Sequence, residues 1–192
     1  MTEIKKIPAA SKYQGEIAEN YDEIRELKTN TSRDQEIIEN ILNQFKEGSF
    51  IGDIPAGTGR FLLPTISRNM NYLGLDISED MLSVARQKYS NFKNSNNKIT
   101  TKCNLIQGSA EKINIDDESL DWLLSVKFIK HLPNQEIVEK VLSEFHRVVR
   151  IGAIVQVKIS NSNNNKASFF QRLASQIKIN NNLSNRITSC RK

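Results

Sequence analysis

Cysteine is scarce in this chain: its 192 residues contain two, Cys103 and Cys190. They lie far apart and form no C-x-x-C pair, so neither a disulfide framework nor a zinc site is indicated. Long apolar runs are missing as well, and the first residues lack the apolar stretch of a signal peptide. We therefore expect a cytoplasmic protein with no membrane span and no bound metal.

Two glycine-rich nucleotide motifs are also missing. A dinucleotide-binding fingerprint requires G-x-G-x-x-G, but counting from Gly57 and Gly59 the third position is occupied by Leu62. No G-x-x-x-x-G-K-[ST] sequence occurs either, which excludes a phosphate-binding P-loop. Dehydrogenases and P-loop nucleotide hydrolases are therefore poor candidates.

Acidic residues are missing from the last quarter of the chain. None follows Glu144, whereas nine lysines and arginines do, so residues 145–192 carry +9 and residues 1–144 carry −4 of the net charge of +5. Such a segment is typical of tails that bind RNA or anionic membrane surfaces. The clustered arginines and interleaved aromatics that favour RNA binding are absent. We expect a solvated tail and keep nucleic-acid binding as an alternative.

Length and hydrophobic pattern predict a single α/β domain. A chain of this size, 38% hydrophobic, can bury one sizeable core but not two. Because predicted strands and helices alternate, the sheet should be mostly parallel and covered on both faces. The expected strands lie near 49–54, 71–76, 103–108, 120–126 and 152–159, and the expected helices near 79–90 and 134–149.

Two amphipathic helices are expected before the first strand. Apolar residues at helical spacing run from Tyr13 to Leu27 and again from Ile37 to Phe45, where Ser32 or Asp34 can serve as the amino-terminal cap. Pro64 requires the helix after the glycine turn to start near it or to kink there.

The chain accordingly divides into three parts. Residues 1–46 form amino-terminal helices that can serve as a lid, and residues 47–160 form the core. Residues 161–192 are expected to hold one more amphipathic helix, over 169–177, and a basic tail.

The most informative stretch combines a glycine turn with a carboxylate on the next strand. Residues 51–60 read IGDIPAGTGR, an apolar strand that breaks into a glycine turn, and residues 73–78 read LGLDIS, a second strand that ends in Asp76. Glycine lets the backbone approach a ligand closely, and an acid at the tip of the next strand can hold ribose hydroxyls. The layout predicts a nucleotide-type site.

These residues resemble the class I S-adenosylmethionine-dependent methyltransferases, in particular the group that acts on quinones and other small molecules. The similarity covers roughly residues 20–160. Further segments resemble the family's later motifs and occur in the same order along the chain. They are residues 77–86 (ISEDMLSVAR), 105–111 (LIQGSAE), 120–126 (LDWLLSV) with 131–133 (HLP), and 144–150 (EFHRVVR). The resemblance implies a Rossmann-like, doubly wound, mostly parallel sheet. It also implies S-adenosylmethionine as cofactor and transfer of its methyl group to a small-molecule acceptor by direct displacement.

The carboxyl-terminal end departs from the family pattern. Family members usually finish with two further strands that form an antiparallel hairpin at the sheet edge, and the residues after Ile159 contain no convincing strand pair. We expect a fold that lacks this pair, and an open edge strand invites pairing with a second copy of the chain.

The resemblance further implies a set of cofactor-binding residues. Asp53 acts around the methionine moiety, Asp76 accepts hydrogen bonds from the ribose, and Ile77 and Met81 flank the adenine. Where the family often has Gly-Asp-Ala, this chain has Ser109 in place of the acid, which predicts cofactor binding weaker by about 1 kcal/mol. The full predicted set is Tyr21, Asp53, Pro55, Ala56, Gly57, Gly59, Arg60, Asp76, Ile77, Met81, Ser109, Ala110 and Val126.

The acceptor side is less defined by the sequence. His131, just after the fourth strand, is the candidate base because imidazole titrates near neutral pH. Lys127 and Lys130 could hold an anionic acceptor. The chain has neither an Asn/Asp-Pro-Pro-aromatic motif nor a Pro-Cys pair, which counts against methylation of nucleic-acid bases. Two alternatives remain: a methyltransferase-like binding protein without turnover, and an RNA methyltransferase anchored by the basic tail.

Overall fold

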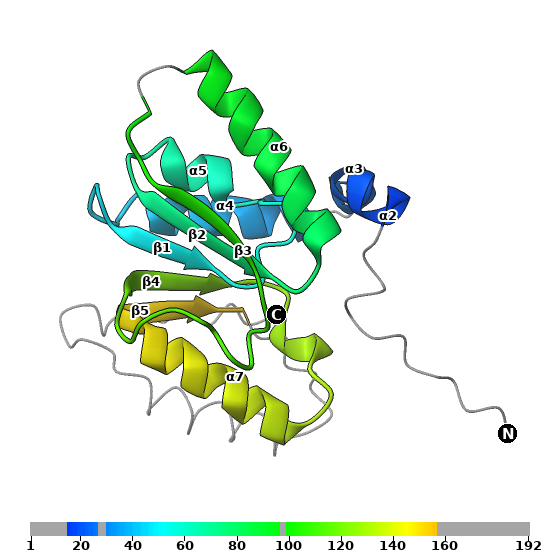
Figure 1. Ribbon diagram of the computed structural model, residues 1–192, viewed down its shortest axis with the longest axis vertical. Helices are drawn as coiled ribbons and strands as arrows, with labels where there is room; N and C mark the ends of the chain where they lie inside the picture. The colour runs from blue at the N-terminus through cyan, green and yellow to red at the C-terminus, as the bar shows by residue number, and fades with distance from the viewer. Residues whose placement is uncertain (1–14, 27–29, 97–98, 157–192) are drawn as a thin grey trace, which may run out of the picture.

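Five parallel strands form one sheet in the order β3-β2-β1-β4-β5 (Figure 1). The computed structural model describes residues 15–26, 30–96 and 99–156. The strands are β1 (Phe50–Asp53), β2 (Asn71–Asp76), β3 (Cys103–Gln107), β4 (Leu120–Ser125) and β5 (Val149–Val155). The strand order reverses between β1 and β4, so the topological switch point lies at the carboxyl ends of these two strands.

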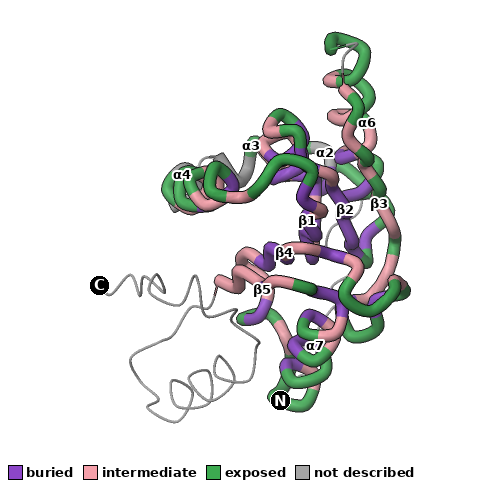
Figure 2. Tube along the Cα trace, turned by 90° about the vertical axis from the view of Figure 1, so that its left-hand side faces the viewer, coloured by how far each residue is buried: buried purple, intermediate pink, exposed green. Residues whose placement is uncertain are grey.

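Helices cover both faces of the sheet, which confirms the predicted α/β class. They are α2 (Glu16–Glu19), α3 (Tyr21–Glu26), α4 (Asn30–Leu42), α5 (Leu62–Ile66), α6 (Glu79–Ser95) and α7 (Gln135–Val148), with the short 3₁₀ helix η1 (Ile129–His131). Figures 1 and 2 show α4 and α7 on opposite sides of the strands.

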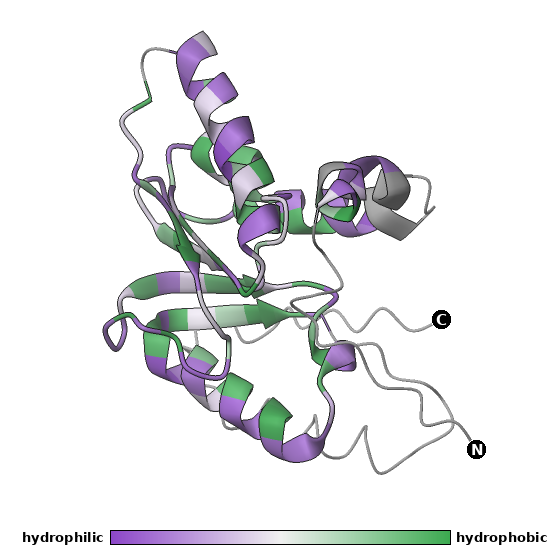
Figure 3. Cartoon of the chain, turned by 45° about the vertical axis from the view of Figure 1, so that its right-hand side comes forward, coloured by the Kyte–Doolittle hydropathy of each residue, from purple (hydrophilic) through white to green (hydrophobic). Residues whose placement is uncertain are grey.

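In the described part of the chain, α7 is the only α-helix on one face of the sheet. Its first turn is capped by the side chain of Asn134, which accepts a 2.9 Å hydrogen bond from the N–H of Ile137. Figure 3 shows hydrophobic and hydrophilic segments alternating along it, as expected when one helix face is buried. The buried side chains of α7 pack with Leu73, Leu75 and Leu123 of the sheet; they are Val138, Val141, Leu142, Phe145 and Val148.

The opposite face carries two smaller clusters. Ile38 and Leu42 of α4 pack with Ile51 of β1, while α5 and α6 pack around the fully buried Tyr72 of β2. Figure 2 shows the buried residues of the strands gathered between these helical layers. The two faces together hold the carboxyl ends of β1, β2 and β4 in fixed positions.

Two expectations about the amino-terminal helices are wrong. The pattern from residue 13 to 27 is interrupted at Asn20, which separates α2 from α3, and residues 13, 14 and 27 lie outside the described residues. Helix α4 begins at Asn30, so the proposed cap Asp34 lies inside the helix. Its carboxylate has partners across the sheet edge instead, since Oδ2 pairs with Nζ of Lys127 at 3.0 Å and Oδ1 accepts from the Gln156 amide at 3.0 Å.

The element boundaries otherwise follow the sequence closely. α5 begins two residues before Pro64, as the proline requires. β5 begins at Val149, earlier than expected, because Val149 already pairs with Leu120 of β4. The end of the expected fifth strand, the expected helix over 169–177, the basic tail and the expected missing strand pair all lie outside the described residues. None of the helices in the described segments is long and apolar enough to cross a bilayer.

Candidate functional site

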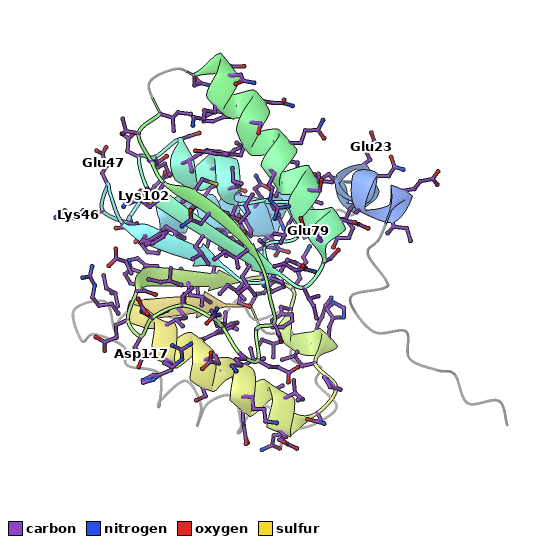
Figure 4. All side chains as sticks on the ribbon, in the orientation of Figure 1. Glu23, Lys46, Glu47, Glu79, Lys102 and Asp117 are labelled. Carbon is purple, nitrogen blue, oxygen red and sulfur yellow. The ribbon has the colours of Figure 1, made fainter. Side chains whose placement is uncertain are left out.

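Most of the predicted site residues lie at one edge of the sheet, where β1, β2 and β4 end. Figure 4 shows Glu79, in the first turn of α6, near this edge, whereas Lys46, Glu47 and Lys102 lie at the opposite edge. In open α/β sheets the crevice outside the carboxyl ends of the strands, at the switch point, is where ligands bind.

The glycine turn after β1 adopts the backbone conformation that its glycines permit. Gly57 and Gly59 have φ of 55° and 71°, a left-handed region that disfavours residues with a Cβ. A Cβ at Gly59 would lie 2.9 Å from Cβ of Ala85, so this glycine also lets the turn approach α6. The turn is tied to β2 by the N–H of the buried Ala56, which donates a 2.9 Å hydrogen bond to the carbonyl of Leu75. Pro55, before Ala56, is half-buried.

Asp76, at the carboxyl end of β2, faces this turn. Its Oδ2 accepts a 2.8 Å hydrogen bond from the N–H of Gly57, and its Oδ1 accepts one of 2.9 Å from the N–H of Ser78. The residue is 7% exposed. Burial raises the pKa of the carboxyl group, although the backbone N–H groups of Ser78, Gly57 and Ile77 act in the opposite direction. A carboxylate has about four lone-pair sites, so it can accept further donors, as the hydroxyls of a ribose would supply.

Asp53, at the end of β1, is held by a tyrosine on the neighbouring strand. The hydroxyl of Tyr72 donates a 2.7 Å hydrogen bond to its Oδ2, and both residues are buried. Burial, and then the charge of Asp53, raise the pKa of Tyr72 well above its ordinary value. The tyrosine is therefore a neutral donor throughout the physiological range. Sequence reasoning missed this contact.

The two apolar candidates after β2 have different environments. Ser78 caps α6 by accepting a 3.3 Å hydrogen bond from the N–H of Met81. Met81 is buried, and its methyl group would be 3.5 Å from a Cβ added at Gly57. Ile77 is 46% exposed, which is unusual for a large apolar residue and leaves its side chain available to a ligand at this edge.

The third motif uses its serine locally. Oγ of Ser109 accepts a 3.2 Å hydrogen bond from the N–H of Glu111, and Ser109 and Lys112 form an isolated β-bridge. Ala110 is buried in the core beneath α7. This hydroxyl stabilises its own turn, next to the end of β3.

The amino-terminal helices are anchored to the glycine turn by residues that the sequence reasoning did not single out. Asp22 of α3 accepts a 2.7 Å hydrogen bond from Oγ1 of Thr58 and forms an ion pair with Lys88 of α6. Lys88 also donates to the carbonyl oxygen of Thr58 at 2.8 Å. Tyr21, the predicted residue on this segment, is the half-buried first residue of α3, directly before Asp22.

A second anchor joins α4 to the ends of β4 and β5. It consists of the contacts of Asp34 with Lys127 and Gln156 described above, and Lys127 has a positive φ of 59°. Arg60 belongs to the same region, but its Nε donates to the amide oxygen of Gln35 at 3.0 Å. Val126, the last residue of the predicted set, is half-buried and packs in the core beneath α4.

Two further polar residues lie at the carboxyl end of β4 or shortly after it. His131 ends η1 and its side chain is exposed to solvent. Ser125 is fully buried at the carboxyl end of β4, and its hydroxyl has no hydrogen-bond partner among the described residues. A buried polar group without a partner is unusual, and it is consistent with a ligand or water at the switch point. Nothing in the sequence pattern distinguished Ser125.

A hollow elsewhere on the surface is not part of this site. It is lined by residues from the ends of α5 and α6 and from the segments preceding β2 and β3: Ile66, Ser67, Asn69, Phe92, Asn96, Ile99 and Thr101. These segments lead into the amino ends of the strands, opposite the edge where Asp53 and Asp76 lie. The candidate site therefore rests on the convergence of side chains and backbone donors at the carboxyl edge.

The chain matches a known protein family. Residues 52–157, more than half of the chain, match the family described as a methyltransferase domain. The chain belongs to this methyltransferase domain family, and the family implies S-adenosyl-L-methionine as the methyl donor.

Two curated relatives illustrate the likeness. A demethylmenaquinone methyltransferase of Staphylococcus carnosus is 29% identical over 114 residues, which cover 58% of this chain and 43% of the relative. A ubiquinone/menaquinone biosynthesis C-methyltransferase of Campylobacter jejuni is 30% identical over 115 residues, covering 56% and 43%. The match thus spans less than half the length of these relatives.

A solved structure has the same fold. A putative S-adenosyl-L-methionine-dependent methyltransferase from Methanococcus maripaludis superposes with a TM-score of 0.66 at 20% identity, covering 92% of this chain and 88% of that chain. At this level of identity the likeness establishes the α/β architecture that the sequence predicted.

Proposed function

We propose that this chain binds S-adenosylmethionine at the carboxyl edge of its sheet and transfers the methyl group to a small-molecule acceptor. The observation that carries the proposal is the position of Asp76. It is a buried carboxylate one strand from the switch point, held by the N–H groups of Gly57 and Ser78 and able to accept further donors. Such a group is suited to binding a vicinal diol, because each carboxylate oxygen can accept more than one hydrogen bond.

Each predicted residue then has a role that its position supports. Asp76 accepts hydrogen bonds from the ribose hydroxyls, and Ile77 and Met81 provide apolar surface for the base. The glycine turn, from Pro55 through Gly59, lets the backbone approach the ligand, and Asp53 orders the methionine end. The remaining members of the proposed site are Tyr21, Arg60, Ser109, Ala110 and Val126.

Methyl transfer from S-adenosylmethionine requires few catalytic groups from the protein. The cofactor supplies both the methyl group and its own leaving group, so the protein needs to align the acceptor, exclude water and, for some acceptors, remove a proton. His131 is the proposed base for such a proton, since its exposed imidazole lies just beyond β4. Residues 47–160 form the proposed cofactor-binding core and residues 1–46 the proposed lid, which the contact of Asp22 with Thr58 supports.

Exposed apolar residues favour an apolar acceptor. Besides Ile77, which we assign to the base, Ile17 on α2 and Ile37 on α4 are 51% and 41% exposed. One curated relative is named a demethylmenaquinone methyltransferase, and another a ubiquinone/menaquinone biosynthesis C-methyltransferase. A ring compound with a quinone nucleus is therefore the first acceptor class to test.

The test is transfer of a radioactive methyl group from labelled S-adenosylmethionine to a reduced demethylated naphthoquinone. We expect label in the organic extract, lost in Asp76→Ala and retained in Glu47→Ala, whose exposed carboxylate lies at the opposite edge. Cofactor binding with no transfer to this or any other acceptor in a cell extract would contradict the enzymatic role and favour a binding protein.

The RNA alternative receives less support from the described residues. Arg147 and Arg150, two of the nine basic residues after Glu144, form ion pairs with Asp117, Glu144 and Asp121. Label in the RNA fraction, abolished by 0.5 M salt, would restore this alternative.

A further inference from the structure

The side chain of Tyr72 can reach Asp53 because Gly74, which lies on the same face of the sheet, has no side chain. In the parallel pairing of β1 and β2, Tyr72 lies opposite Ile51, and Gly74 lies opposite Asp53. Residues two apart on a strand share a face, so Tyr72, Gly74 and Asp53 are on the same side of the sheet. A Cβ added at Gly74 would be 2.9 Å from Cε1 of Tyr72. The phenol ring therefore passes over Gly74 on its way to the end of β1.

The contact at the end of this path joins a neutral donor to a carboxylate out of contact with solvent. The Tyr72 hydroxyl lies 2.7 Å from Oδ2 of Asp53, and the two residues are 0% and 2% exposed. Hydrogen bonds to an ionised acceptor are about twice as strong as those between neutral groups. Burial, and then the charge of Asp53, raise the pKa of Tyr72 well above its ordinary value, so the hydroxyl is a donor at neutral pH.

Core packing alone does not require this hydroxyl. The ring packs with Leu62, Ile66 and Ala85 beneath α5 and α6, and a phenylalanine would fill the same space. The hydroxyl adds a single interaction, and that interaction is with the acid beside the glycine turn.

We propose that Tyr72 is a positioning residue for cofactor binding: its ring passes over Gly74, and its hydroxyl donates to the Asp53 carboxylate and holds it in one orientation. The proposal rests on the proposed function, in which Asp53 orders the methionine end of S-adenosylmethionine. Tyr72 itself does not touch the ligand: it acts through Asp53.

The experiment compares Tyr72→Phe with the wild type by calorimetric titration with S-adenosylhomocysteine from pH 5 to 8. We expect binding about tenfold weaker at neutral pH, as for loss of a hydrogen bond to a charged group. The deficit should grow on acidification, because removing a donor from a carboxylate raises its pKa and neutralises it at higher pH. Tyr89→Phe is the matched control: Tyr89 packs against the same cluster and makes no side-chain hydrogen bond in the described part of the chain.

The outcomes separate this proposal from the proposed function. Failure of the folded wild-type protein to bind either S-adenosylmethionine or S-adenosylhomocysteine overturns the function itself. A wild type that binds, together with Tyr72→Phe that binds equally well at every pH, overturns only the role of Tyr72. A uniform loss of affinity with an unchanged pH profile, accompanied by lower thermal stability, shows a packing role and also overturns it.

A measurement on the wild type covers the case in which Tyr72→Phe does not fold. In the complex with S-adenosylhomocysteine, we expect the hydroxyl proton of Tyr72 to exchange slowly with solvent in NMR spectra. The carboxyl carbon of Asp53 should shift on saturation with the ligand. An Asp53 resonance that the ligand leaves unchanged overturns the proposal.

Discussion

Oγ1 of Thr58 donates a 2.7 Å hydrogen bond to Oδ1 of Asp22, a residue 36 positions earlier in the chain. Lys88 of α6 pairs with the other oxygen of the same carboxylate and also donates to the carbonyl of Thr58. One acid therefore joins α3, the glycine turn and α6. Because Thr58 stands between the two glycines of the turn, a movement of α3 and the conformation of the turn are coupled.

Asp22→Ala should loosen this anchor. We expect faster amide hydrogen exchange over residues 16–26 and release of S-adenosylhomocysteine about five to ten times faster, because the closed position of α3 loses a hydrogen bond and a half-buried ion pair. Hydrogen exchange with mass spectrometry and stopped-flow displacement measure the two effects. Glu23→Ala, an exposed change on the same helix (Figure 4), should leave both unchanged. Equal exchange in the two variants would contradict the anchor.

Gly59→Ala should destabilise the protein by about 2–4 kcal/mol. The residue has φ of 71°, and the new Cβ would be 2.9 Å from Cβ of Ala85, so both backbone strain and steric overlap contribute. Gly48→Ala is the matched control, with φ of 78° and open space around the added Cβ. It should cost about 1–2 kcal/mol from the backbone alone. Urea unfolding measures both values, and equal losses would show that the approach of the turn to α6 is not tight.

The glycine turn and the strands were open to prediction because their signals are local. Apolar runs ended by Gly57 or by Asp76 specify buried strands and their turns within a few residues. The partners of Asp34 could not be predicted from the sequence. An acid near the start of a helix is equally compatible with a helix cap and with an ion pair across the sheet edge. The contact with Lys127 depends on where β4 ends in space, which local pattern does not contain.

Arg147→Lys should lower the free energy of unfolding by about 1–2 kcal/mol. The guanidinium donates to the carbonyls of Ile113 and Ile115 at 2.6 and 2.9 Å and pairs with Glu144 and Asp117. A lysine ammonium cannot reproduce this fork of donors. Arg150→Lys, at an exposed guanidinium paired with Asp121, should change stability by less than about 0.5 kcal/mol. Equal effects of the two substitutions in urea unfolding would show that the extra hydrogen bonds of the Arg147 guanidinium do not contribute to stability.

Glu144 should make stability depend on acid pH. The hydrogen bond from Arg147, and to a lesser degree the N–H of Ile113, lower the pKa of Glu144 below its ordinary value. An acid with a lowered pKa contributes stability that is present above its unfolded pKa and lost as the pH falls through the folded value. Glu144→Gln should therefore show a shallower loss of stability below pH 4.5 than the wild type. Glu139→Gln, on the exposed side of the same helix, should follow the wild type; identical curves for all three proteins would contradict the linkage.

Part of the site was accessible from the sequence, and part was not. Asp53, Asp76 and the glycines carry a motif with fixed spacing, and the structure brings them to one edge. Tyr72 and Ser125 carry no such signal, since a tyrosine or a serine in a buried strand is compatible with plain packing. Their meaning comes from the register of β1 with β2 and from burial at the end of β4, which exist only in the folded chain.

The central claim is that Asp76 makes the carboxyl edge a cofactor site, and calorimetric titration with S-adenosylmethionine tests it most directly. We expect the wild type and Glu47→Ala to bind with a micromolar Kd, about −8 kcal/mol. Asp76→Ala should bind at least about tenfold more weakly while remaining folded, because the ligand hydroxyls lose a charged acceptor. Equal binding by Asp76→Ala, or no binding by the folded wild type, would contradict the account.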